Sequence, residues 1–519
     1  MVESSRVESR TGAAATLAVE ANEPVQSVET VPSPSGRRLM SGTVQVFLAE
    51  SLLLPTGLLT AAFLTRQLGP DSYGVLLLVT AIVSWIGWTI TSAFTRTTIK
   101  FIGETENWQA VATTVLQLHL GLGVAAVVVL WGVSEPLAIA FREPSMVNYL
   151  RLAALEIPIF CLAYVHRSIA VGLGNYSQRA ISTALRWIVR MVLCIALVAA
   201  GFSIAGAIWG SIVAALVELL IYRLYIQPPL FKRSSFPLKN LWGYAIPLFL
   251  LAISLRCYEK LDLLMLKLLG GTAADVGFYG TAQNLSLIPS LFTLAFVPLL
   301  LSTLTRLLYA GNLPAAKNLS QDGMRLVLLL LPFAGLAAGS ASEIITLVFG
   351  SAFLPASGLF SVLIFAAVAM AMIGVTTCIL TAAGKPNWTI SIAGPMVPLA
   401  IVTNGWMIPR FGALGAALTT TAIASLAAIA LILVIYSFWK ILPNPLSVLR
   451  SVLVGGLAYL LATLWITPGW FVLVKLTVLG LGILLGLALL GEFRDRELAF
   501  VQSMLQSGSR AVLRKPSSS

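Results

Sequence analysis

Charged side chains inside long apolar segments are the residues of this sequence best suited to chemistry. Arg186 and Arg190 lie one helical turn apart in the segment 178–201, so we expect them to share a face. If that helix begins near Ser177, Arg190 lies roughly 20 Å deep at a rise of about 1.5 Å per residue. A charge at that depth costs about 2.5–3.5 kcal/mol on insertion scales, so it must face a wet cavity or a partner. The other charged groups placed at depth are Arg96, Arg151, Arg256, Lys260, Glu50, Glu156, Glu218, Glu259 and Asp262.

The balance of these charges favours an anionic ligand. Bases outnumber acids on the segments 75–99, 147–170 and 178–201. Guanidinium groups grip phosphate oxygens through two hydrogen bonds, which suits a phosphorylated substrate in a membrane cavity. The alternative for any single residue is a structural ion pair, for example Arg256 with Glu259 on one helix. The remaining acids would balance charge or carry a coupling proton, and they are Glu50, Glu156, Glu259 and Asp262.

Few residues of the sequence could bind a metal ion or act as a catalytic nucleophile. The four cysteines lie in apolar segments without CxxC spacing, which is typical of small residues packed between helices. The only histidines, His119 and His166, have no carboxylate partner at ligand spacing. The sequence shows no phosphate-binding loop and no nucleophile–base set. We therefore predict that the protein is not an enzyme and uses no metal or cofactor.

Composition indicates the elements that must position these charges. Of 519 residues, 58% are hydrophobic and only 10% are charged, and the mean hydropathy is +0.91, so we predict an all-α polytopic membrane protein. A span needs roughly 20 apolar residues. That length gives about fourteen segments, near 41–66, 75–99, 109–132, 147–170, 178–201, 204–226, 240–268, 276–304, 324–348, 357–382, 388–409, 413–439, 447–466 and 470–491.

Internal similarity groups the first twelve segments into two copies. LGPDSYG at 68–74 is echoed by LGG and VGFYG between 269 and 280, and FSIAGA at 202–207 by FGALGA at 411–416. The offset is about 200 residues, or six spans, so both copies face the same way. We predict two six-helix lobes, 41–226 and 240–439, related by a pseudo-two-fold repeat, with the substrate site between them.

The two ends of the chain differ in composition from the apolar segments. Residues 1–38 and 492–519 are polar and aperiodic. We predict that residues 1–38 form a disordered tail without a signal peptide and that residues 492–519 form a second tail. Segments 447–491 form an extra helix pair that we expect on the outside of the lobes, with Lys475 reaching the nearby interface. Lys and Arg collect in alternate connections, which predicts cytoplasmic termini and accounts for the net charge of +12 without nucleic acid.

The junction motifs resemble a known family. RQLGPDSYG at 66–74 is similar to the R-x-L-G-P-x-x-Y-G junction of oligosaccharide flippases, the polysaccharide-biosynthesis branch of the multidrug/oligosaccharidyl-lipid/polysaccharide exporter superfamily. In the second copy, YAIP at 244–247, LDLL at 261–264, LLG at 268–270 and VGFY at 276–279 follow that family's seventh and eighth spans in order. The resemblance covers roughly 41–440. The last two spans depart from twelve-span members and resemble the fourteen-span lipid II flippases.

The resemblance implies a V-shaped two-lobe transporter in the bacterial inner membrane. It would flip an undecaprenyl-diphosphate-linked oligosaccharide to the outer leaflet, among membrane lipid and alongside partners such as glycosyltransferases and a polymerase of the same pathway. We predict diphosphate contacts at Arg186, Arg190, Arg256 and Lys260, with Arg96 and Arg151 as secondary candidates. The alternatives are a cation-coupled multidrug-type exporter, which would favour an acid-dominated cavity, and a membrane enzyme of polysaccharide assembly, which usually needs a long outer loop.

Overall fold

The computed structural model describes residues 45–105, 107–229 and 260–492. Every regular element in these ranges is helical, and ten stretches are long and apolar enough to cross a membrane. The predicted all-helical polytopic fold is confirmed. The number of spans stays a prediction, as do the bounds of the lobes and tails. Residues 1–38, most of the segment 240–268 and nearly all of 492–519 lie outside the described residues.

The first group of helices, here named the N-lobe, is built around α2, which consists of two helices joined at Gly69. Its elements are α2 (Leu53–Glu104), α3 (Trp108–Ala140), α4 (Met146–Ala154), α5 (Glu156–Gly172), α6 (Tyr176–Leu197), the π-helical turn η1 (Val198–Phe202) and α7 (Ser203–Tyr225). Within α2 the backbone is helical except at Gly69, where φ is +73°. The two helices on either side of this glycine correspond to the predicted segments 41–66 and 75–99, and the connection between them is a sharp bend at Gly69 rather than a loop of several residues.

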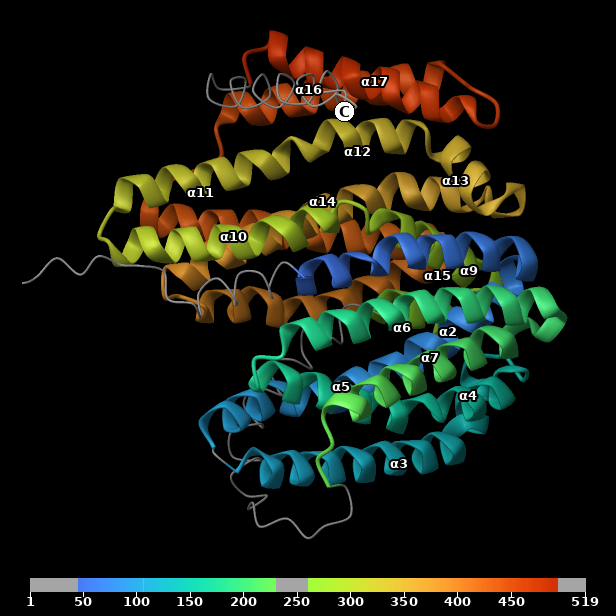
Figure 1. The fold of residues 1–519 in the computed structure, drawn as a ribbon. Coiled ribbons are helices and arrows are strands. Elements are labelled where there is room, and N and C mark those ends of the chain that lie inside the picture. The colour runs from blue at the N-terminus through green and yellow to red at the C-terminus, as the bar shows by residue number, and fades with distance from the viewer. Residues whose placement is uncertain (1–44, 106, 230–259, 493–519) are drawn as a thin grey trace, which may run out of the picture.

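The second group of helices is here named the C-lobe. After a helical stretch at 260–268 come α9 (Ala273–Ser286), α10 (Ser290–Tyr309), α11 (Leu313–Leu328), α12 (Leu330–Gly339), α13 (Ala341–Phe349), the 3-10 turn η2 (Ser351–Phe353), α14 (Ala356–Ala382) and α15 (Asn387–Trp439). Gly412, at φ +57°, breaks α15 between the predicted segments 388–409 and 413–439. The lobes meet mainly where α2 packs against α9 (Figure 1).

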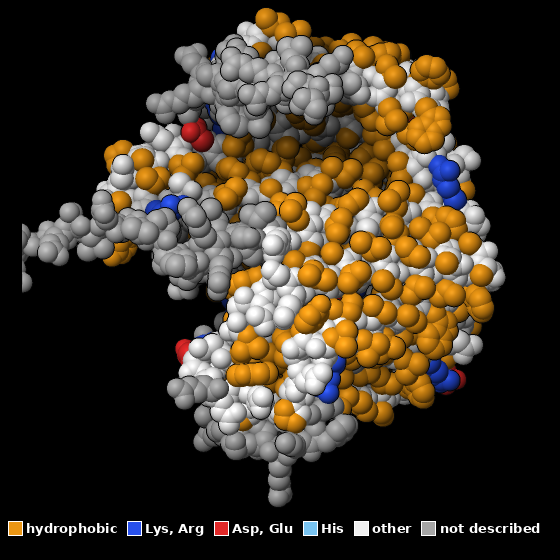
Figure 2. Space-filling view, viewed as in Figure 1, with side chains coloured by type: hydrophobic (Ala, Val, Ile, Leu, Met, Phe, Trp, Pro, Cys, Tyr) orange, Lys and Arg blue, Asp and Glu red, His pale blue; other side chains and the backbone are white. Residues whose placement is uncertain are grey.

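A helical hairpin, α16 (Pro445–Leu464) and α17 (Phe471–Leu489), follows the C-lobe. It packs against α11 and α12 and lies at the outer edge of the C-lobe, opposite the edge of the N-lobe formed by α3 (Figure 1). A Cβ on Gly335 of α12 would overlap the carbonyl of Gly455 on α16, so small residues allow the close approach of the two helices. Hydrophobic side chains cover most of the face seen in Figure 2, and charges on it are sparse, as expected for a surface in lipid.

One expectation about the hairpin is wrong. Lys475 does not reach the interface, because its side chain is fully buried and its ammonium group pairs with Glu343 of α13. The other carboxylate oxygen of Glu343 accepts from the backbone N–H of Thr467, at 2.6 Å, and from its hydroxyl, at 3.2 Å. A deep ammonium without a partner is costly, so this contact compensates the lysine and attaches the hairpin to the C-lobe.

Candidate functional site

The lobes are closed at the end that the Lys and Arg distribution predicts to face outward, here named the outer end. Arg66 of α2 donates to the carbonyls of Leu347, at 2.5 Å, and Val348, at 3.3 Å, at the end of α13. A cation suits the carbonyl end of a helix, where the dipole is negative. In the opposite direction, Lys267 of the C-lobe donates to Glu143 of the N-lobe at 2.7 Å. Each lobe therefore contributes one cation to the closure.

Glycines allow the backbones to meet at this end. A Cβ on Gly74 would overlap the carbonyl of Ala273, and one on Gly277 would overlap the carbonyl of Pro70. The aromatic ring of Tyr73 packs edge-on against Phe353, at 6.0 Å between centroids. These residues belong to or adjoin the junction motifs of the two copies, so the motifs mark a place where the lobes touch.

A cavity of about 440 Å³ lies behind this closure, between the lobes. Its wall is formed by α2, α6 and α7 of the N-lobe and by residues 260–287 of the C-lobe. The polar and aromatic lining residues are Thr56, Thr60, Tyr73, Thr80, Ser84, Trp88, Trp187, Arg190, Ser211, Lys260, Gln283 and Asn284. Among the described residues that line it there is no Asp or Glu. The wall therefore offers hydrogen-bond donors and positive charge.

Arg190 is the cation that the N-lobe contributes to the wall. Its Nε donates to the hydroxyl of Ser211 on α7, at 3.2 Å, and both residues line the cavity. The helices α6 and α7 approach closely there, because a Cβ on Gly210 would collide with Cys194. This contact positions the guanidinium on the cavity side of α6. Glu156 of α5 lies within electrostatic reach of Arg190 and Arg186 and lines no part of the cavity.

Lys260 is the cation that the C-lobe contributes. Two residues further along the same helix, Asp262 is buried and accepts from the hydroxyl of Tyr279 at 2.5 Å and from that of Thr420 at 3.3 Å. The amide of Gln283, which lines the cavity, also donates to Asp262 at 3.4 Å. Asp262 therefore sits behind the wall and fixes the polar residue in front of it. Whether it carries a coupling proton stays a prediction.

Arg186 occupies a different environment from Arg190. Its Nη1 lies 3.0 Å from Oε2 of Glu218 on α7, and its guanidinium packs over the rings of Phe160 and Trp187. Arg186 is absent from the cavity wall. The structural alternative that we gave for single residues applies here, with Glu218 as the partner.

The remaining predicted residues are not brought into this wall. Arg96 and Arg151 are exposed, and Arg151 donates to Ser134 at 3.0 Å on the side of α3. Glu50 pairs with Arg167 and, at 3.3 Å, with Arg179, which is a charge-balancing arrangement. Arg256 and Glu259 lie outside the described residues.

Sequence reasoning missed the uncharged part of the wall. Trp88 and Trp187 line the cavity, and the indole N–H of Trp187 is buried and meets no hydrogen-bond acceptor in the described part of the chain. Gln283 and Asn284 supply amides, and Asn284 donates to Tyr73 across the lobes at 3.2 Å. The sequence signal for a functional role was the pair of amide side chains within a predicted span, just after the VGFY motif. Polar side chains in a span are costly and are usually retained for a function.

Comparison with known proteins places the fold. Residues 63–358 match the model of a family described as "Polysaccharide biosynthesis protein". The chain belongs to that family. The resemblance seen in the junction motifs is confirmed, and the protein is a multi-pass membrane protein. No curated protein matches the chain in sequence.

Solved structures share the fold of the chain. The lipid II flippase MurJ in an inward closed conformation superposes with a TM-score of 0.70 at 14% identity, covering 87% of this chain and 98% of that chain. An inward-facing multidrug resistance MATE family transporter of the MOP superfamily gives 0.61 at 16%, covering 75% and 94%. A point mutant of the Vibrio cholerae MATE transporter VcmN gives 0.57 at 15%, covering 77% and 97%.

Proposed function

We propose that the protein is a flippase that moves a lipid-diphosphate-linked oligosaccharide across the bacterial inner membrane for cell-surface polysaccharide synthesis. The family to which the chain belongs is one of polysaccharide biosynthesis, and the fold is that of proteins named as a lipid II flippase and as MATE transporters. Both support a transport role. Neither identifies the substrate, which must be argued from the cavity.

The observation that carries the proposal is the pair of cations that the two lobes contribute to one cavity. Arg190 comes from the N-lobe and Lys260 from the C-lobe, and no carboxylate lies among the described lining residues. A diphosphate bears at least two negative charges and many acceptor oxygens, so it is stabilised by one cation from each lobe. The hydroxyls and amides around them suit a sugar, which offers donors and acceptors in alternation.

A substrate held by both lobes also gives a mechanism. The lobes are closed at the outer end and the cavity lies behind that closure. A ligand that bridges Arg190 and Lys260 interacts differently with each arrangement of the lobes, which is the condition for a ligand to shift a conformational equilibrium. The headgroup would cross in the cavity while the lipid chain stays in the membrane.

The runner-up, a multidrug-type exporter, is weakened by the same wall. Cationic drugs need acidic partners, and Glu156 and Asp262 are not among the lining residues. A membrane enzyme of polysaccharide assembly would need catalytic groups in a substrate cleft. We therefore favour the flippase over both the multidrug-type exporter and the membrane enzyme.

The test is export in cells that lack the chromosomal copy of the gene. We expect Arg190→Gln and Lys260→Gln each to reduce surface polysaccharide strongly with unchanged protein in the membrane, and Arg190→Lys to retain part of it, since charge remains but the bidentate geometry is lost. The matched control is Arg410→Gln, an exposed arginine that stacks on Trp406 away from the cavity. Full export by the Arg190→Gln, Lys260→Gln double variant would contradict the proposal.

A further inference from the structure

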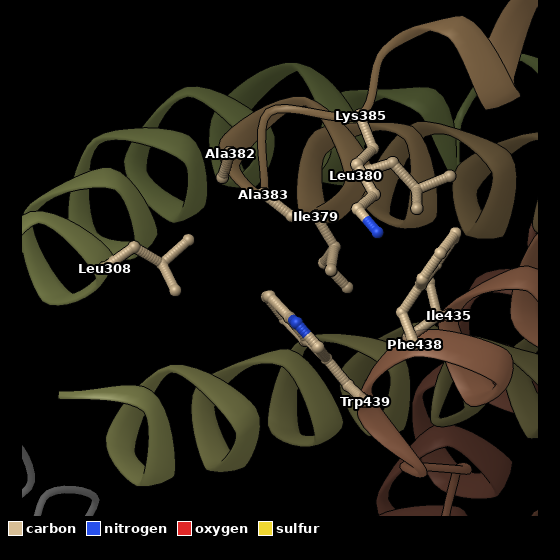
Figure 3. A pocket seen from close by; sticks show the side chains of 9 residues that line it. All are labelled: Leu308, Ile379, Leu380, Ala382, Ala383, Lys385, Ile435, Phe438 and Trp439. Atoms are coloured by element: carbon tan, nitrogen blue, oxygen red, sulfur yellow. The ribbon is translucent and has the colours of Figure 1, made fainter. Parts of the chain in front are cut away.

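A second cavity, of about 190 Å³, lies at the other end of the C-lobe, on the side that the Lys and Arg distribution predicts to be cytoplasmic. It is formed by the ends of α10, α14 and α15 (Figure 3). The helix α14 packs against both α10 and α15, whereas those two barely touch one another. The lining at the end of α14 includes Ala382 and Ala383, whose short side chains leave the space open.

Eight of the nine lining residues are apolar or aromatic, and the ninth is Lys385. All nine are described, and none is acidic. The ammonium nitrogen of Lys385 points into the space and lies 3.3 Å from the centroid of the Phe438 ring (Figure 3). A cation over an aromatic face is an attractive contact, and it keeps the charge at the mouth of an otherwise apolar pocket.

The turn that carries Lys385 is built to hold it there. Gly384 has φ +72°, and the N–H of Lys385 donates to the carbonyl of Leu380 at 2.9 Å, which closes the end of α14. Pro386 follows immediately as the N-cap of α15. Phe438 is held in turn by Trp388, whose ring meets it edge-on at 5.7 Å. The lysine is therefore fixed at both its backbone and its tip.

The corresponding turn of the N-lobe has the same backbone and a different residue. Gly174 has φ +76°, and the N–H of Asn175 donates to the carbonyl of Ala170 at 2.7 Å. Asn175 therefore stands where the C-lobe has Lys385. The repeated turn explains the glycine in both copies but does not by itself require a lysine at the next position.

We propose that this pocket binds an anionic phospholipid of the adjoining leaflet, with its phosphate on Lys385 and the first part of an acyl chain against Leu308, Ile379 and Ile435. Charge complementarity and the apolar lining together carry the proposal. A soluble phosphate would meet one cation in an apolar wall and lose its hydration. A phospholipid brings its own apolar portion, and a lysine near the membrane surface favours an anionic headgroup.

The experiment compares lipid retention by the full-length purified protein in native mass spectrometry, with phosphatidylglycerol and phosphatidylcholine offered at equal concentration. We expect preferential retention of phosphatidylglycerol. Lys385→Gln should reduce it about fivefold. The matched control, Lys440→Gln, removes another lysine that lies over an aromatic ring, 5.1 Å from the centroid of Tyr436, but not one that lines the pocket. It should bind as the wild type does.

A second variant distinguishes the contribution of the pocket's shape from that of the lysine's charge. Ala383→Leu keeps Lys385 but places a larger side chain in the pocket, so it should also reduce retention of phosphatidylglycerol. Lys385→Arg keeps the charge and should preserve retention. Equal retention by Lys385→Gln and wild type would overturn the proposal, as would equal retention of both lipids by the wild type. Displacement of phosphatidylglycerol by glycerol phosphate would also overturn it, because the site would then recognise a soluble phosphate.

Discussion

Arg186 and Glu218 form an ion pair inside the N-lobe, with Nη1 and Oε2 3.0 Å apart, although 32 residues separate them in the chain. Glu218 is 2% exposed and Arg186 is 12% exposed, so the pair is shielded from the cavity and from lipid. Of two arginines one turn apart, one is therefore structural and the other, Arg190, lines the cavity.

We predict that Arg186→Gln lowers the stability of the protein. Removing one partner of a buried pair leaves an uncompensated charge and costs about 3–5 kcal/mol. The measurement is the melting temperature of the purified protein in detergent. The Arg186→Gln, Glu218→Gln double variant should recover most of the loss, because no charge is then stranded. If the single variant melts like the wild type, the pair contributes nothing to the fold.

The buried contact between Lys475 and Glu343 leads to a similar prediction for the hairpin. Lys475→Met should destabilise the protein and loosen α16 and α17 from the C-lobe, since Glu343 keeps its charge and loses its cation. Limited proteolysis near 440–445 reports on the docking. Adding Glu343→Gln should restore resistance. The idea fails if Lys475→Met alone is cleaved no faster than wild type.

At the outer end, we predict that breaking the contact between Lys267 and Glu143 favours the outward-open arrangement. In a cysteine-free background, Glu143→Gln should raise the labelling rate of Asn284→Cys by a membrane-impermeant maleimide added from outside. A loss of about 1.4 kcal/mol from the closed state corresponds to a tenfold change. Glu135→Gln, at an exposed acid of α3, is the control and should leave the rate unchanged. Unchanged labelling of the Glu143→Gln protein would show that the contact does not hold the lobes.

Gly74 gives an independent test of the same closure. A Cβ at this position overlaps the carbonyl of Ala273, so Gly74→Ala should prevent the lobes from meeting and should also raise labelling of Asn284→Cys. Gly121→Ala is the matched control, because a Cβ on Gly121 meets no atom within 4 Å. Equal labelling of the two alanine variants would mean that the close approach of α2 and α9 is not needed.

The helices and their order could be predicted from the sequence because each span must satisfy its own backbone in lipid, which leaves a strong apolar signal. The kinks were harder to predict. The stretch around Gly69 and Pro70 reads as a loop, yet one residue with a positive φ lets the hydrogen-bonded backbone continue on both sides. A short polar run near a membrane surface is compatible with either structure.

The charged residues within the spans could be identified from the sequence, but their partners and roles could not. Spacing placed Arg186 and Arg190 on one face, and the crossing of α6 and α7 then decided that one meets Glu218 and the other Ser211. That crossing depends on the approach of Gly210 to Cys194, which no spacing along α6 reveals. Lys475 was misplaced for the same reason, since its partner belongs to another part of the chain.

The central claim, that a diphosphate binds between Arg190 and Lys260, is tested most directly by binding of undecaprenyl diphosphate to the purified protein, measured by native mass spectrometry. Loss of one charge-assisted contact of about 1.5–3 kcal/mol predicts an affinity lower by roughly ten- to a hundredfold for Arg190→Gln and for Lys260→Gln. Arg410→Gln should bind as the wild type does. Wild-type affinity in the Arg190→Gln, Lys260→Gln double variant would contradict the account.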